Sequence, residues 1–527
     1  MDLEKAAQRA GSVLAGSKTP ERTAAFALAA TVGTSFGPGL LPRPGLDQAL
    51  ATGIIGATQH GLVMTSQSAC AALARQFVAD DGTPLGRVRS FAAEAAVNAG
   101  LAVAGAAAER LLAPRPGEPM RRALLRTAGR RATLVGLAGA ALSAIAAADA
   151  AVGGRRPGLR ILAAGGGLLA GTALAGWQIH RYHVGEKAEA GRLAPATDPL
   201  TGEVASPTGS GYVNYVAIET LEYLTRGDCA TVALQYSLRP SFLSLDRVGM
   251  GREQNRALLH ALEWRLQGLP EGQRPRLVGF GESLGAHTMQ DAFLHEGVSG
   301  LHRVGMDRAL FLGTPAGSKW AKQWRLDPAH TDPDGEVAEV ASHAEWLALP
   351  AIAGNGRARR RYVLLSHHED PITRFEPALI VQEPGWLGPV AGRPPGISRL
   401  AAWYPLTTFV LTLMDVKNAL DVTPGRFAAR GHDYRADLAR MVSEVYGLPA
   451  GDEEMLAIER ALRRREAEWA QRRLVAEQLR RAKEAVRRQT RNWGLAQDAV
   501  TTGPGAAQRA GRPEVAASAS PGDTHGR

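Results

Sequence analysis

Apolar residues are concentrated in the first third of the chain, in long stretches that hold few or no charges. The stretches are residues 23–41, 49–73, 95–108, 132–148 and 161–179. A membrane-spanning helix needs about 20 mostly apolar residues, because its backbone must satisfy its own hydrogen bonds across roughly 30 Å of hydrocarbon. Only the stretch at residues 95–108 is clearly short of that length. The pattern predicts an α-helical transmembrane domain over residues 23–180, with four or five spans, after a polar segment at residues 1–22.

The same stretches are rich in alanine and glycine, which are weakly hydrophobic, so a water-soluble helical bundle is the alternative. Small residues are also what closely packed membrane helices use at their contacts. Arginines cluster at residues 121–131 and 155–160, where they would meet lipid headgroups. Positive charge favours the cytoplasmic side; if residues 110–131 and the N-terminus both lie there, the helices make four spans. We therefore predict a multi-pass protein of the cell membrane whose C-terminal part is cytoplasmic.

The pattern changes after a polar linker at residues 181–205. Apolar segments that suit short buried strands are residues 230–236, 276–280, 309–312 and 362–365. Helical patterns cover residues 213–224, 252–269, 284–293 and 436–445. Strands that alternate with helices of this length favour a mostly parallel sheet flanked by helices. We therefore predict an α/β domain over residues 206–450.

A long charged segment, residues 451–494, follows this domain. Its apolar residues recur every three or four positions from Met455 to Val486, among many arginines and glutamates. This spacing predicts one long amphipathic helix, which would bind a partner helix over residues 455–493 or lie on a membrane surface. Residues 495–527 are rich in Gly, Ala, Pro and Ser, and we predict a disordered tail.

The net charge of +10 would suit either nucleic acid or an anionic membrane. Most of the excess is arginine beside the apolar stretches and in the C-terminal helix. We therefore assign it to membrane topology and headgroup contact, and we expect no nucleic-acid partner. The two cysteines, Cys70 and Cys229, lie in different regions and indicate neither a disulfide framework nor a metal site.

The sharpest chemical motif is Gly281-Glu282-Ser283-Leu284-Gly285. A serine hydroxyl is a weak nucleophile, and hydrolases present it on a tight turn between small residues that let the backbone bend and the substrate approach. In a chain with 60 glycines the pattern alone is weak evidence. The predicted strand directly before it and helix directly after it complete a nucleophile elbow. We therefore predict that Ser283 is a nucleophile.

A serine nucleophile needs a base, and the base needs an acid to orient it. Asp370 follows the predicted strand at residues 362–365, at the strand end where such folds place their acid, and Glu369 is the competing choice. His367 and His368 beside these carboxylates raise the question of a metal. Neighbouring side chains point in different directions, and no second ligand cluster accompanies them, so we predict no metal site.

His432 is the expected base, because it lies in a glycine-marked loop late in the chain and completes the order serine, acid, histidine. It would take the proton of the serine hydroxyl and return it to the leaving group. The oxyanion would be bound by the N–H of Leu284 and by a second donor from the glycine-rich segment at residues 206–212, around Gly209 and Ser210. That segment also fits an ordinary helix start.

These features together resemble a bacterial family of membrane α/β-hydrolases that joins an N-terminal multi-span domain to a C-terminal catalytic domain. The matching segments are residues 37–44, 207–211, 234–237, 280–285, 370–371 and 431–434. The resemblance covers roughly residues 20–447 and implies a triad of Ser283, Asp370 and His432. Such domains normally carry two or three strands before the oxyanion loop. Only residues 182–206 precede it here, so we expect a shortened sheet.

The expected activity is that of an esterase or lipase-like serine hydrolase. It would act on a lipid or other acyl ester through an acyl-Ser283 intermediate, without a cofactor. Two tryptophan-containing segments, residues 320–357 and 375–422, flank the acid and would either form a cap facing the bilayer or belong to the core. The alternative functions are an acyltransferase with the same triad and a non-catalytic membrane scaffold with a hydrolase-like fold.

Overall fold

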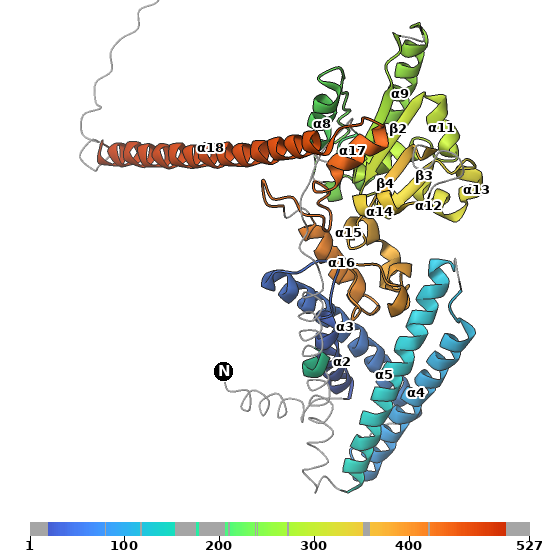
Figure 1. The fold of residues 1–527 in the computed structure, drawn as a ribbon. Helices are drawn as coiled ribbons and strands as arrows, with labels where there is room; N and C mark the ends of the chain where they lie inside the picture. Colours follow the sequence, from blue (N-terminus) through green and yellow to red (C-terminus); the bar gives the residue numbers. More distant parts are fainter. Residues whose placement is uncertain are drawn as a thin grey trace, which may run out of the picture. The chain divides into compact units, whose positions relative to one another are not determined.

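Figure 1 shows the fold in a computed structural model of the chain. The structure describes residues 19–501, with gaps. The gaps are residues 79–80, 116–117, 153–174, 179–205, 209–210, 238, 240, 271–272, 351–358 and 420–421. The chain divides into two compact units at Leu462, and each is described by itself. The predicted apolar stretch at residues 161–179 falls almost wholly outside the described residues, as does the linker at residues 181–205.

The N-terminal region is helical. Its helices are α2 (Thr19–Ser35), α3 (Gly45–Phe77), α4 (Pro84–Leu111) and α5 (Met120–Ala151). Helix α4 begins where the Thr83 hydroxyl accepts a hydrogen bond from the N–H of Gly86. The predicted stretch at residues 23–41 is helical only as far as Ser35, and the residues after it form a loop that leads to α3.

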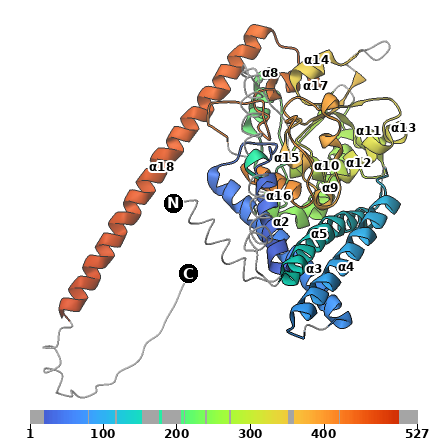
Figure 2. The same cartoon turned by 90° about the horizontal axis from the view of Figure 1, so that it is seen from below.

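Helices α4 and α5 lie side by side in both views (Figures 1 and 2). Glycines allow this close approach: a Cβ added to Gly105 would lie 2.5 Å from the carbonyl oxygen of Gly129, and one added to Gly136 would lie 2.6 Å from that of Asn98. Asn98, which precedes Gly105 in α4, meets Gly136, which follows Gly129 in α5. The two helices are therefore antiparallel. The small residues that dominate the sequence here therefore act as helix contacts.

Two of the described helices, α4 and α5, are long and apolar enough to cross a membrane by length and composition. The apolar stretch at residues 95–108, short as a sequence segment, is part of the longer helix α4. Large apolar side chains on these two helices are exposed, among them Val103, Leu134 and Leu137. Such side chains would be stable against lipid.

The C-terminal part of the first unit is built on a parallel sheet. Its strands are β1 (Leu277–Glu282), β2 (Met306–Leu312), β3 (Val337–Val340) and β4 (Tyr362–Leu365), in the spatial order β1-β2-β4-β3. All three neighbouring pairs are parallel. The carboxyl ends of the strands therefore meet at one edge, where an α/β fold places its ligands.

Helices cover both faces of this sheet. They include α8 (Tyr215–Thr225), α9 (Val248–Gln267), α10 (Leu284–Asp291), α11 (Gly297–Arg303) and α17 (Leu438–Tyr446). Leu310 and Leu312 of β2 belong to the apolar cluster with α8 and α17, whereas Ala309 and Phe311 belong to the cluster with α9, α10 and α11. In Figure 1, α8 and α17 lie on one side of the strands and α11 lies on the other. The predicted α/β-hydrolase-like fold is confirmed.

The predicted strands at residues 276–280, 309–312 and 362–365 are confirmed. The one predicted at residues 230–236 is wrong, because that segment is extended and mostly exposed and pairs with no strand. The sequence pattern does not predict β3, a strand of four residues inside the first of the two tryptophan-containing segments. Trp320 and Trp346 of that segment are each 1% exposed and belong to the core. These two tryptophans are therefore core residues rather than parts of a cap.

The second tryptophan-containing segment, residues 375–422, joins the sheet domain to the N-terminal helices. It includes α16 (Thr407–Asn418). Val410 of α16 packs with Ile55 of α3, and Lys417 forms an ion pair with Asp47 of α3 at 2.7 Å.

Helix α18 (Asp452–Thr501) is the predicted long charged helix, and it continues past the predicted end at residue 494. Met455, Ile458 and Leu462 of its first turns belong to the core of the first unit. In the second unit its apolar side chains Leu474 and Leu479 are exposed. Residues 502–527, most of the predicted disordered tail, lie outside the described residues.

Candidate active site

Ser283 stands on the turn between β1 and α10. Its backbone has φ 56° and ψ −123°, a conformation that is strained for any residue with a side chain and that places the hydroxyl at the tip of a sharp bend. The flanking glycines are required sterically. A Cβ at Gly281 would lie 2.7 Å from the backbone of Ala286, and one at Gly285 would collide with the carbonyl oxygen of Ser206. The predicted elbow is therefore present in its local geometry.

Asp370 and His432 are in direct contact. Nδ1 of His432 lies 2.7 Å from Oδ2 of Asp370, and the two side chains are 2% and 0% exposed. Because the partner is a carboxylate, we assign the proton to Nδ1, which leaves Nε2 free to act as a base. The contact favours Asp370 over Glu369 as the orienting acid. Glu369 instead accepts a hydrogen bond from the N–H of Gly431 at 3.4 Å.

The carboxylate of Asp370 is held from two further directions. Its Oδ1 accepts the N–H of Ile372 at 2.8 Å, as the N-cap of the short helix α15 (Pro371–Arg374). Its Oδ2 accepts a hydrogen bond from the hydroxyl of Tyr434 at 2.5 Å. Burial lowers the pKa of His432, but the charge and hydrogen bond of Asp370 outweigh burial and raise the pKa above its ordinary value.

Gly313, directly after β2, connects this pair to the elbow. The N–H of Ser283 donates to the carbonyl of Leu312 at 2.9 Å, so the chain after β2 passes beside the nucleophile turn. A Cβ at Gly313 would lie 2.7 Å from Nδ1 of His432 and 2.9 Å from Oδ2 of Asp370. The imidazole therefore rests on the backbone that follows β2, between the strands that carry the serine and the acid.

Glu282, the residue before the nucleophile, is buried beside this group. Its Oε1 accepts a hydrogen bond from Asn214 at 3.4 Å, and its Oε2 has no partner among the described residues. Burial raises the pKa of Glu282 to about 7, against the opposing effect of nearby His432. A buried carboxyl with a raised pKa thus lies next to the histidine.

The start of the predicted oxyanion segment is held against the elbow. The N–H of Ser206 donates to the carbonyl of Phe280 at 2.6 Å, and Ser206 makes a parallel bridge with Gly281. Side chains add a buried network, in which Asn255 of α9 donates to the hydroxyls of Ser206 and Thr288, each at 3.2 Å. Nothing in the sequence pattern marks Asn255 or Thr288 for this task.

Leu284 is the first residue of α10, so its backbone N–H is not used within the helix and is free to bind an oxyanion. Gly209 and Ser210 lie outside the described residues, and the second donor predicted there stays a prediction. The segment at residues 206–208 is placed beside the elbow, as an oxyanion loop requires.

The remaining histidines beside the acid have structural partners. Nδ1 of His367 is 2.9 Å from the carbonyl oxygen of Gly431, and its ring stacks on Tyr434 with centroids 4.3 Å apart. His368 pairs with Glu345 at 3.0 Å. Among the described residues, no group of three or more His, Cys, Asp or Glu is arranged to hold a metal.

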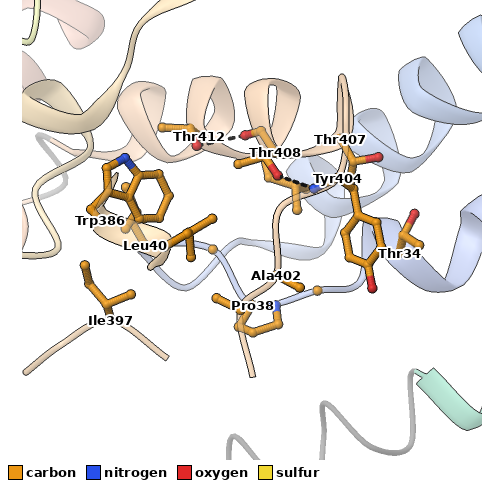
Figure 3. A pocket seen from close by; sticks show the side chains of 15 residues that line it. Thr34, Pro38, Leu40, Trp386, Ile397, Ala402, Tyr404, Thr407, Thr408 and Thr412 are labelled. Atoms are coloured by element: carbon orange, nitrogen blue, oxygen red, sulfur yellow. Dashed lines mark hydrogen bonds between the residues drawn. The ribbon is translucent and has the colours of Figure 1, made fainter. Parts of the chain in front are cut away.

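An apolar cleft lies between the α2–α3 loop and residues 386–412 (Figure 3). Pro38, Leu40, Trp386 and Tyr404 are among its lining residues. Its threonine hydroxyls make hydrogen bonds within the wall, such as that of Thr412 with the carbonyl of Thr408 at 2.8 Å. None of the three predicted catalytic residues lines this cleft, so it is separate from the serine site.

The parallel sheet, its flanking helices and the elbow at the carboxyl end of β1 define an α/β-hydrolase fold. Residues 196–458 match the model of a protein family described as the alpha/beta-hydrolase family. This match supports an α/β-hydrolase-like fold for that part of the chain. Neither the curated proteins nor the solved structures gave a match to the chain.

Proposed function

We propose that the protein is a membrane-anchored serine hydrolase that cleaves carboxylic esters of apolar acyl groups. The observation that carries this proposal is the buried contact of His432 with Asp370 at the sheet edge from which Ser283 projects. A hydrolase-like fold without catalytic activity would not require an imidazole oriented by a carboxylate at this position.

In the proposed reaction, Nε2 of His432 removes the proton of Ser283 as the hydroxyl oxygen attacks the ester carbonyl carbon. The N–H of Leu284 and a donor from the segment after residue 208 stabilise the oxyanion. The tetrahedral intermediate collapses, and the alcohol leaves with the proton from His432. Water, deprotonated by the same imidazole, then attacks the acyl-enzyme and releases the carboxylic acid and Ser283. Asp370 keeps the ring oriented and stabilises its charged form throughout.

Helices α4 and α5 support the membrane part of the proposal, since both are long and apolar enough to span a bilayer. We propose a multi-pass arrangement that places the hydrolase domain on the cytoplasmic side. An enzyme held at this surface would meet acyl esters that partition into lipid. This favours a lipid-like substrate over a small soluble ester.

A fluorophosphonate probe tests the reaction in the full-length protein. We expect labelling of the wild type and none of Ser283→Ala. Ser299→Ala is the matched control, because Ser299 is an exposed helical serine that bonds only to a local carbonyl at 2.6 Å. Absence of labelling in folded wild-type protein would refute the proposal. A charged, membrane-impermeant version of the probe, applied to intact and to lysed cells, tests the sidedness: only lysed cells should give labelling.

A further inference from the structure

The loop between α2 and α3, residues 36–44, is fixed to the hydrolase domain by a buried ion pair. Nε of Arg43 lies 2.9 Å from Oδ1 of Asp415 on α16, and the two side chains are 6% and 0% exposed. The other carboxylate oxygen accepts the backbone N–H of Leu40 at 2.7 Å. A charged pair this deeply buried fixes the position of the loop, because any movement would leave a charge unpaired inside the protein.

The same loop reaches the segment that carries the proposed base. A Cβ built on Gly431 would lie 3.0 Å from Cδ2 of Leu41, so the leucine side chain covers the backbone of the residue directly before His432. Leu40, beside it, points into a separate apolar cluster with Leu387 and Ile397. The two leucines thus fill different spaces, and Leu41 is the one next to the base.

Gly431 is enclosed from the other directions by the acid segment. Its carbonyl oxygen lies 2.9 Å from Nδ1 of His367, and its N–H donates to Glu369 at 3.4 Å. With φ at +59° the backbone takes a turn here that only glycine adopts easily. Leu41 packs against this turn at the α-carbon of Gly431, and its removal would give the turn space to shift.

We propose that Leu41 is a positioning residue, by which the N-terminal helical region holds the turn before His432 and so completes the active site. The inference rests on the proposed function. Its physical basis is that proton transfer to a base is sensitive to displacement, and a misplacement of about 1 Å can cost on the order of 100-fold in rate. Leu41 acts through Gly431, so its loss should lower kcat and leave substrate binding unchanged.

The test uses full-length protein in detergent micelles, with p-nitrophenyl butyrate as substrate. For Leu41→Ala we expect a fall in kcat of about 10-fold or more, with KM within about twofold of wild type. Leu41→Met, which keeps the apolar volume, should recover most of the rate. Leu46→Ala is the control, since Leu46 is a few residues away and 74% exposed, and its kcat should match the wild type.

A wild-type kcat in folded Leu41→Ala would overturn the inference. So would a raised KM with unchanged kcat, because Leu41 would then contact the substrate. Should Leu41→Ala unfold below the assay temperature, Leu41→Val makes a smaller cavity and should give a smaller loss of kcat in the same direction. Failure of the proposed function would look different, because the wild type itself would then neither turn over the ester nor react with the fluorophosphonate at Ser283.

Discussion

Replacing Gly313 by alanine should displace His432, the proposed base, while leaving the identity of every proposed catalytic residue unchanged. The backbone at Gly313 has φ +51°. An added Cβ would stand 2.7 Å from Nδ1 of His432 and 2.9 Å from Oδ2 of Asp370. Ordinary van der Waals contacts of a Cβ begin at about 3.4 Å. The imidazole must therefore move by roughly 0.7 Å or more, because the protein interior is too densely packed to absorb the methyl group elsewhere.

The substitution has two costs that can be separated. The left-handed backbone conformation should lower the free energy of unfolding by about 1–2 kcal/mol once a side chain is present. The displacement of His432 should lower the rate of acylation of Ser283 by on the order of 10- to 100-fold. Gly305 offers a matched control: its φ is +69°, and a Cβ added there meets nothing within 4 Å. Gly305→Ala therefore imposes the backbone cost alone.

The assay is the second-order rate of fluorophosphonate labelling, measured for both variants alongside their thermal unfolding midpoints. We expect both variants to lose thermal stability through the shared backbone cost, with a larger loss for Gly313→Ala because its methyl group also displaces buried atoms, and a loss of labelling rate confined to Gly313→Ala. Equal labelling rates for the two variants would refute the reasoning, because the imidazole would then not rest on Gly313 in the active state.

Three further substitutions have definite outcomes. Tyr434→Phe removes a donor from the buried carboxylate of Asp370; in denaturant titration the free energy of unfolding should fall by about 1–3 kcal/mol, and kcat in the ester assay should fall with it. Glu282→Gln removes a carboxyl whose pKa burial raises to about 7 from 4.5. Native Glu282 binds its proton more tightly than the unfolded chain does. The free energy of unfolding of the wild type should therefore fall by on the order of 3 kcal/mol as pH rises from 4.5 to 7. Denaturant titrations across that range should show that Glu282→Gln lacks this contribution to the pH dependence. Trp320→Ala should lower the free energy of unfolding by about 3–5 kcal/mol, while the ratio of kcat/KM for short and long acyl esters stays unchanged; a cap residue would alter that ratio.

The parts of the site that the sequence predicts are those with a local signal. The elbow was predictable because a strand, a five-residue turn and a helix are contiguous. Asp370 was predictable because it follows directly on a buried apolar strand, and a parallel sheet brings such strand ends to one edge. His432 needed only the chain order and a glycine-marked loop. Its contact with Asp370 spans 62 positions, yet both residues could be found from their immediate neighbours.

The parts that the sequence does not predict depend on a partner that is distant in the chain. Residues 230–236 form an apolar segment that suits a short buried strand, but strand formation needs a neighbour to pair with, and the free side of β1 is partly occupied by the bridge to Ser206. Asn255 is one of a run of polar residues, 252–256, in a helical pattern, and its contacts become visible only when Thr288 lies beside it. Leu41 belongs to an apolar run that reads as part of a membrane span.

The proposed chemistry is compatible with the four strands of the described residues, because it uses only part of the sheet. Ser283 and the acid follow β1 and β4, and β2 lies between these two strands. No strand precedes β1 among the described residues, and within them the start of the proposed oxyanion segment is not held by a strand ladder. The bridge of Ser206 to Gly281 and the hydrogen bonds of Asn255 hold it instead. An edge fixed by a few side chains is more easily displaced than one fixed by a strand ladder. Substitutions in α9 should therefore affect the proposed oxyanion site more than the other proposed parts of the active site, although α9 carries none of the predicted catalytic residues.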